Sequence, residues 1–75
     1  DPWPSTRNDQ IRAIQRLLTE LRYYSASPTG QLGVLTQAAI REYQRAMGMR
    51  QTGEPSKELF ESLKETRART SAQSD

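Results

Sequence analysis

The sequence predicts an all-α fold, a small three-helix bundle with an internal pseudo-repeat. The segment Ile11–Arg16 returns as Ile40–Arg45 with four of six positions identical, including the glutamine. A Thr-Gly pair at 29–30 likewise returns at 52–53. Apolar residues recur at helical spacing in three stretches, and glycine or proline separates these stretches. Two helical half-units are therefore the expected plan, with a third helix completing the bundle.

Residues 1–8 are expected to form an extended N-terminal arm. Pro2 and Pro4 flank Trp3, and each proline disfavours helical geometry in the residue before it. We expect Trp3 to fold back onto the helices, because its large apolar ring gains from burial. The domain itself is expected to span residues 9–65.

The first helix should begin at Asn8 or Asp9, because either side chain can cap a helix. It should end near Arg22 and Tyr23. The apolar stripe of this helix recurs at spacings of three and four and consists of Ile11, Ile14, Leu17, Leu18 and Leu21.

Residues 25–33 are rich in Ser, Pro, Thr and Gly and predict a loop. Gly33 stands where the second helix begins, and Gly48 is expected to end that helix in a left-handed conformation. Ser56 is a good N-cap for a third helix. The expected inward residues are Thr36, Ala39, Ile40, Tyr43 and Met47 in the second helix and Leu59, Phe60 and Leu63 in the third.

The last ten residues, 66–75, are expected to form a flexible tail or linker. The apolar pattern ends after Lys64, and the segment holds Ser, Thr, Arg, Ala and Gln without a large apolar residue. Such a composition buries too little surface to offset the entropy of ordering the chain.

Composition argues against catalysis and against a metal or other cofactor. The chain has no cysteine, so it can form no thiolate metal site, and it has no histidine, the commonest general base and metal ligand. Glu58, Glu61 and Glu65 occur at helical spacing beside lysine and indicate a solvated face rather than an acid and base pair. We expect neither an enzyme nor a cofactor or metal site.

Charge and hydropathy also exclude two classes of partner. The net charge is +2 and the pI is about 9.4, but this small excess comes without a recognised nucleic-acid-binding signature. The sequence holds no apolar run of the length that spans a bilayer. We therefore expect no nucleic acid and no direct membrane contact in this segment, and a monomer for the isolated domain.

Three spaced motifs carry a resemblance to a known family. They are Gln15-x-x-Leu18-x-x-Leu21-x-Tyr23-Tyr24, then Gly30-x-x-Gly33-x-x-Thr36-x-x-Ala39-Ile40-x-x-Tyr43-Gln44, then Gly48-Met49 with Gly53. From about Ile11 to Leu63 the chain resembles the peptidoglycan-binding-like domains, which are compact three-helix modules attached to bacterial cell-wall hydrolases and other envelope proteins. The resemblance implies a binding module located outside the cytoplasm, in the periplasm or cell wall.

The chain departs from the family pattern at four positions. Arg22 stands where the family usually has glycine, Pro28 replaces a branched aliphatic residue, and Thr29 and Thr52 replace aspartates. Arg22 must either accept a left-handed conformation at a cost of about 1 kcal/mol or end the helix differently. The threonine hydroxyls can still bond nearby backbone groups, more weakly than a carboxylate does.

The motif residues have both structural and ligand-binding interpretations. Gln15 and Gln44 border the apolar stripes, where an amide can bond the backbone of an adjoining loop or contact a ligand. Gly30, Gly33 and Gly53 favour backbone conformations that side chains obstruct, and Gly33 could alternatively let a ligand approach closely. The glycine corners are expected to present one pre-shaped hollow, a shallow groove near the loop from Tyr23 to Thr36 and the start of the second helix.

Two further groups of side chains are candidates for ligand contact. Tyr23 and Tyr24 are adjacent, so one should pack inward and the other should be available for stacking. Arg41 and Arg45 could bind carboxylates of a peptidoglycan stem peptide. The alternatives are that they are merely solvated, or that they pair with Glu42 and the acidic third helix.

The predicted function is noncatalytic recognition of peptidoglycan or a muropeptide, tethering a larger parent protein to the wall. The alternative is a degenerate domain that acts as a protein-protein interaction or regulatory module in an envelope protein. The candidate ligand-binding residues are Tyr23, Tyr24, Thr29, Gly30, Gln31, Gly33, Thr36 and Arg41.

Overall fold

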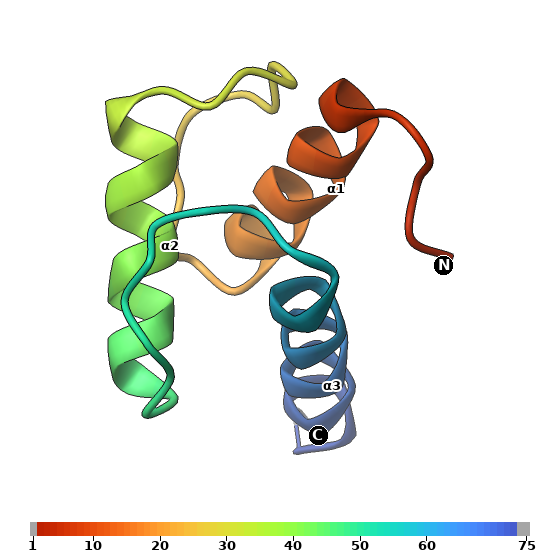
Figure 1. The fold of residues 1–75 in the computed structure, drawn as a ribbon. Helices are drawn as coiled ribbons and strands as arrows, with labels where there is room; N and C mark the ends of the chain where they lie inside the picture. The colour runs from red at the N-terminus through yellow and green to blue at the C-terminus, as the bar shows by residue number, and fades with distance from the viewer. Residues whose placement is uncertain (1, 74–75) are drawn as a thin grey trace.

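The computed structural model describes residues 2–73 and places three helices in them (Figure 1). These are α1 (Arg7–Glu20), α2 (Val34–Ala46) and α3 (Lys57–Gln73), and no strand occurs within this range. Helix α1 packs against both other helices. In Figure 1, the loop that follows α2 runs back past that helix to reach the start of α3. The predicted all-α three-helix bundle is confirmed.

Helix α1 begins earlier than expected, within the segment predicted to be the arm. Thr6 is the N-cap, and its hydroxyl accepts a hydrogen bond from the Asp9 backbone N–H at 3.3 Å. Neither Asn8 nor Asp9 is the cap. The carboxylate of Asp9 instead lies in the first turn, where the helix dipole favours negative charge. The extended arm therefore ends before Arg7, and residue 1 lies outside the described range.

Helices α1 and α2 end in the same hydrogen-bonded motif. The N–H of Tyr23 bonds the carbonyl of Leu18 at 2.8 Å, and the N–H of Met49 bonds the carbonyl of Gln44 at 2.7 Å. Each motif turns on one left-handed residue, Arg22 with φ +68° in α1 and Gly48 with φ +71° in α2. Arg22 thus adopts the left-handed conformation that glycine adopts without cost.

The core joins all three helices through their predicted apolar faces. Its buried members are Ile14, Leu17, Leu18, Tyr24, Ala39, Ile40, Tyr43, Leu59, Phe60 and Leu63. Trp3 folds back as expected, with its ring centroid 5.1 Å from that of Phe60. Met47, expected to face inward, is 42% exposed because it lies at the end of α2 as its C-cap.

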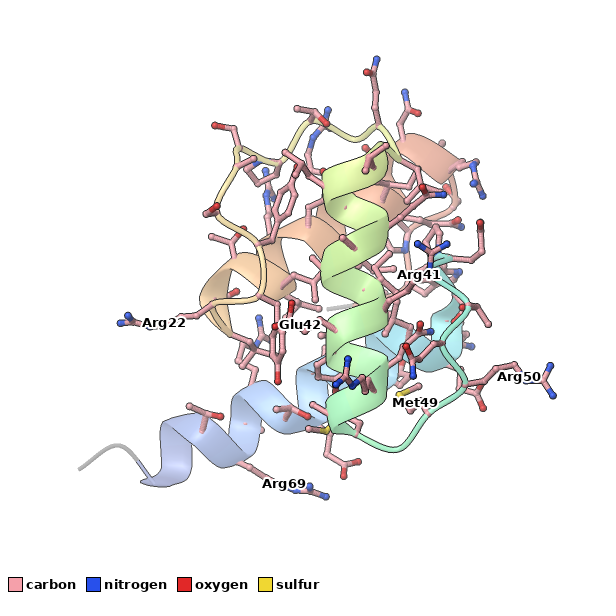
Figure 2. All side chains as sticks on the ribbon, turned by 90° about the vertical axis from the view of Figure 1, so that its left-hand side faces the viewer. Arg22, Arg41, Glu42, Met49, Arg50 and Arg69 are labelled. Carbon is pink, nitrogen blue, oxygen red and sulfur yellow. The ribbon has the colours of Figure 1, made fainter. Side chains whose placement is uncertain are left out.

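Helix α3 continues to Gln73, so the prediction of a flexible tail from residue 66 is wrong for most of that segment (Figure 2). Thr66 lies 2.9 Å from the Tyr43 hydroxyl, and Arg67 pairs with Glu20 of α1 at 3.5 Å. These polar contacts hold the extra turns against the bundle without large apolar side chains. Residues 74–75 lie outside the described range, and a linker role for the segment stays a prediction.

Ser56 caps α3 as predicted, since its hydroxyl accepts from the Leu59 N–H at 3.0 Å. Within residues 2–73, no helix combines the length and apolar character needed to cross a membrane.

Candidate functional site

The first Thr-Gly turn is organised around the buried amide of Gln15. Its carbonyl oxygen accepts hydrogen bonds from the backbone N–H groups of Thr29 and Gly30, both at 2.9 Å. Its amide nitrogen donates to the Thr36 hydroxyl at 2.9 Å and to the Gln31 carbonyl at 3.1 Å. Gln15 therefore ties the loop and the first turn of α2 to α1, which is the structural role expected for it.

The second Thr-Gly turn repeats this arrangement around Gln44. The carbonyl oxygen of Gln44 accepts from the Gly53 N–H at 3.0 Å, and its amide donates to the Thr52 hydroxyl at 3.0 Å. The threonine hydroxyl also accepts from the backbone N–H two residues ahead in both turns, at 3.2 Å. The two repeated segments thus form equivalent hydrogen bonds. In each turn the threonine hydroxyl accepts the bond that an aspartate side chain would otherwise accept.

An arginine lies over the glycine of each turn. A Cβ atom on Gly30 would come within 3.1 Å of the Arg12 guanidinium, and one on Gly53 would come within 2.9 Å of Arg41 Nε. Both glycines also have positive φ, +80° and +68°. Arginine side chains thus occupy the space directly over both glycines. A hollow lies beside the second turn, and its lining consists of Gln44, Met49, Arg50, Thr52, Glu54, Ser56 and Glu58.

Gly33 is the N-cap of α2 and has an extended φ of −107°, with nothing near the place where a Cβ would stand. Its backbone therefore does not require glycine, and no side chain caps the helix there. The next two side chains, Val34 and Leu35, are 80% and 68% exposed. The start of α2 is open on its outer side.

The two adjacent tyrosines have different environments. Tyr24 is the inward one and is buried in the core. Tyr23 is half-buried and meets the fully buried Tyr43 edge to face, with the centroids 5.5 Å apart. Core packing therefore sets the orientation of Tyr23, while part of its ring remains accessible for a ligand.

Two shallow hollows lie on the outer side of α2. The first, here called the tyrosine hollow, is lined by Tyr23, Tyr24, Ser25, Ala26, Leu35, Ala38, Ala39 and Glu42. The second, here called the arginine groove, is lined by Tyr23, Ala38, Arg41, Glu42, Arg45, Ala46 and Gln51. They share Tyr23, Ala38 and Glu42, so they form one continuous surface, which we call the α2 face. This side of the helix faces the viewer in Figure 2.

The α2 face carries charged side chains that form no ion pair within the described range. Arg41 and Arg45 are both exposed, and neither forms an ion pair with a residue in the described range. Glu42 is exposed beside them, equally without an ion pair there. The arginines are therefore solvated and are not paired with Glu42 or with the acidic residues of α3.

The predicted site residues fall into three groups. Tyr23, Tyr24 and Arg41 line the α2 face, whereas Gly33 stands apart at the helix start. The other four, Thr29, Gly30, Gln31 and Thr36, gather around the amide of Gln15.

The candidate list omitted Ala38 and Glu42, which lie at the centre of the α2 face. Their signal in the sequence was their position on the polar side of α2, four residues apart, opposite the apolar stripe. Arg45 is a candidate for carboxylate contact by sequence, although it is not among the candidate ligand-binding residues given above.

Among residues 2–73, no group of acidic side chains is arranged to hold a metal ion.

Comparison with known protein families agrees with the contacts described above. The family model described as "Putative peptidoglycan binding domain" matches residues 7–63, which is most of the chain and covers both Thr-Gly turns, helices α1 and α2, and the start of α3. Comparison with curated proteins and with solved structures gave no match. The chain belongs to the peptidoglycan binding domain family.

Proposed function

We propose that this domain is a noncatalytic module that holds its parent protein at the bacterial cell wall by binding peptidoglycan through the α2 face. The observation that carries the proposal is the combination of family membership with two unpaired arginines and an accessible tyrosine on one continuous surface. The residues of the Thr-Gly turns line neither hollow of this surface, and the proposal gives them no direct contact with the ligand.

Each part of the α2 face suits a different part of the polymer. The accessible part of the Tyr23 ring can stack on a sugar ring or a peptide group. The small side chain of Ala38 lets a ligand approach the helix closely. Outside the α2 face, at the start of the helix near Gly33, the first-turn N–H groups of α2 have no side-chain cap and can donate to an acetamido or carboxylate oxygen.

The hollows are shallow, so a single site should bind weakly. Repeated units along the polymer then raise retention by increasing the effective concentration of the ligand. Such a module serves a parent protein located in the periplasm or the cell wall, and it needs no chemistry of its own.

Co-sedimentation with purified sacculi tests the proposal. We expect the domain to be enriched in the pellet, and we expect Ala38→Gln to reduce that enrichment because the longer side chain fills the shared centre of both hollows. Ala68→Gln is the matched control, since Ala68 is exposed on α3 and lines neither hollow. An unmodified domain that stays in the supernatant across pH and salt would rule out this function.

A protein-interaction module is the second candidate function. The observation that favours it is the exposed pair Val34 and Leu35 at the open start of α2. A photo-crosslinking residue at position 34 in cells would capture a protein partner if this candidate is correct. Capture of a partner combined with no binding to sacculi would favour it over the proposed function.

A further inference from the structure

We propose that the arginine groove binds carboxylate groups of the peptidoglycan stem peptide, with Arg41 and Arg45 as paired donors. This inference rests on the proposed function and specifies which part of the polymer the domain recognises. It follows from the positions of the two arginines, from the absence of internal partners in the described range, and from a difference between the two repeats.

Arg41 and Arg45 lie one helical turn apart on α2 and line the same groove. Side chains at this spacing are neighbours on a helix surface, with Cβ atoms about 6 Å apart. A guanidinium group presents a planar fork of donors that matches a carboxylate. Two such forks, with no acidic partner in the described part of the chain, favour an anionic ligand.

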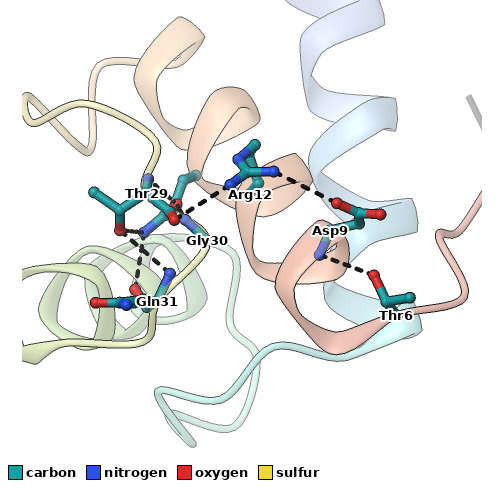
Figure 3. Close-up of polar contacts among 7 residues, drawn as sticks. Thr6, Asp9, Arg12, Thr29, Gly30 and Gln31 are labelled. Atoms are coloured by element: carbon teal, nitrogen blue, oxygen red, sulfur yellow. Dashed lines mark hydrogen bonds and ion pairs between the residues drawn. The ribbon is translucent and has the colours of Figure 1, made fainter.

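The two repeats use equivalent arginines differently. In the first repeat, Arg12 lies over Gly30 and also bonds the Thr29 carbonyl at 3.4 Å and the Asp9 carboxylate at 3.5 Å (Figure 3). In the second repeat, Arg41 lies over Gly53 in the same way but has neither of these polar partners. The second arginine therefore keeps its donors for a ligand.

Gly53 helps to position Arg41. Because glycine has no Cβ, the Arg41 side chain can lie against the turn, where a Cβ would stand only 2.9 Å from Nε. Packing of this kind restricts the rotamers of a long side chain before binding, and so reduces the entropy lost on binding. Arg41 is thus partly preorganised, whereas no such contact holds Arg45.

The remaining walls of the groove set the direction of the ligand. Glu42 also lines the groove, and its carboxylate repels a ligand carboxylate that comes close to it. It can accept hydrogen bonds from peptide N–H groups or an amine instead. The expected ligand is therefore a peptide whose carboxylate lies at the arginines and whose N–H donors lie toward Glu42.

Titration of the domain with three soluble probes tests this inference. The probes are free stem peptide, the same peptide with its carboxylates converted to amides, and glycan strands stripped of peptide. We expect the free peptide to bind, with amide chemical-shift changes at Ala38 and Arg45, and the amidated peptide to bind about tenfold more weakly. The stripped glycan carries lactyl carboxylates and distinguishes that source of the same chemistry from the peptide.

Matched variants complete the experiment. Arg45→Gln should weaken binding of the free peptide about tenfold, and Arg41→Gln should do the same. Arg50→Gln makes the same change in charge at an exposed arginine outside the groove and should leave the affinity unchanged. Added salt should reduce the difference between the unmodified domain and Arg45→Gln, because exposed charges are screened.

Three results would overturn the inference. They are unchanged peptide affinity in Arg41→Gln and Arg45→Gln, equal binding of the amidated peptide, and arginine-dependent binding of stripped glycan in preference to peptide. Each of them leaves the proposed function standing if sacculi still retain the unmodified domain. Failure of the unmodified domain to bind sacculi would instead remove both proposals.

Discussion

Replacing Gln15 by methionine should destabilise the domain strongly, because Gln15 connects α1 to the first Thr-Gly turn. Methionine has a similar size but cannot replace the amide. The substitution leaves the buried Gly30 N–H without its acceptor, which now lies at 2.9 Å. It also leaves the buried Thr36 hydroxyl and the Gln31 carbonyl without their donor.

The magnitude follows from the number of buried groups left without a partner. Two of these groups, the Gly30 N–H and the Thr36 hydroxyl, are in fully buried bonds. At about 1–2 kcal/mol for each, we expect Gln15→Met to lower the free energy of unfolding by about 2–4 kcal/mol. The equivalent Gln44→Met loses its bonds to Gly53 and Thr52, of which the Gly53 N–H is buried. We expect that variant to cost about 1–2 kcal/mol. A domain of 75 residues has a total stability of roughly 4–11 kcal/mol.

Urea unfolding followed by far-UV circular dichroism measures both effects. With an m-value of about 1 kcal/mol/M for so small a domain, the midpoint should fall by about 2–4 M in Gln15→Met. Gln51→Met is the control, because Gln51 is exposed and should change stability by less than about 0.5 kcal/mol. A Gln15→Met midpoint equal to that of the control, or a larger loss in Gln44→Met, would refute this account of the repeat.

Four further predictions concern helix ends and the arm, and urea midpoints check all of them. Arg22→Gly should stabilise the domain by about 0.5–1 kcal/mol, because glycine relieves the strain at φ +68°. Gly48→Ala should destabilise it by about 1 kcal/mol through conformational strain alone, since a Cβ there meets no atom within 4 Å. A destabilising Arg22→Gly or a stabilising Gly48→Ala would contradict this account of the helix ends. Truncation after residue 65 should cost about 1–2 kcal/mol, because it removes the bond of Thr66 to Tyr43, and no loss would mean that the extra turns of α3 are not held by the bundle. Trp3→Ala should cost about 1–2 kcal/mol through loss of its aromatic contact, and an unchanged midpoint would show that the arm does not contribute.

The helices were predictable because helix formation depends on local spacing. The apolar stripe in each segment matches the buried face in the structure, and Gly48 and Ser56 act at helix ends as expected. The start of α1 was missed because Thr6, Asn8 and Asp9 are all acceptable caps by residue type. The end of α3 was missed because polar contacts made by Thr66 and Arg67 leave no periodic apolar signal.

The candidate site was predictable only in part, for a related reason. The repeated glutamines indicated two similar turns, and each glutamine does bond the backbone of its turn. Which side of each turn faces solvent depends on packing between segments distant in sequence. That packing places Arg12 over Gly30 and Arg41 over Gly53. It also leaves the outer side of α2 accessible.

The sequence by itself determined the three helices, the duplication and the family, because these depend on residue type and short-range spacing. Tertiary structure alone decided that Tyr24 is buried while Tyr23 stays accessible, and that Arg12 is engaged within the fold while Arg41 is not. The physical reason is that burial and pairing are properties of the assembled bundle. Two residues of the same type in equivalent repeats can therefore meet different neighbours and serve different purposes.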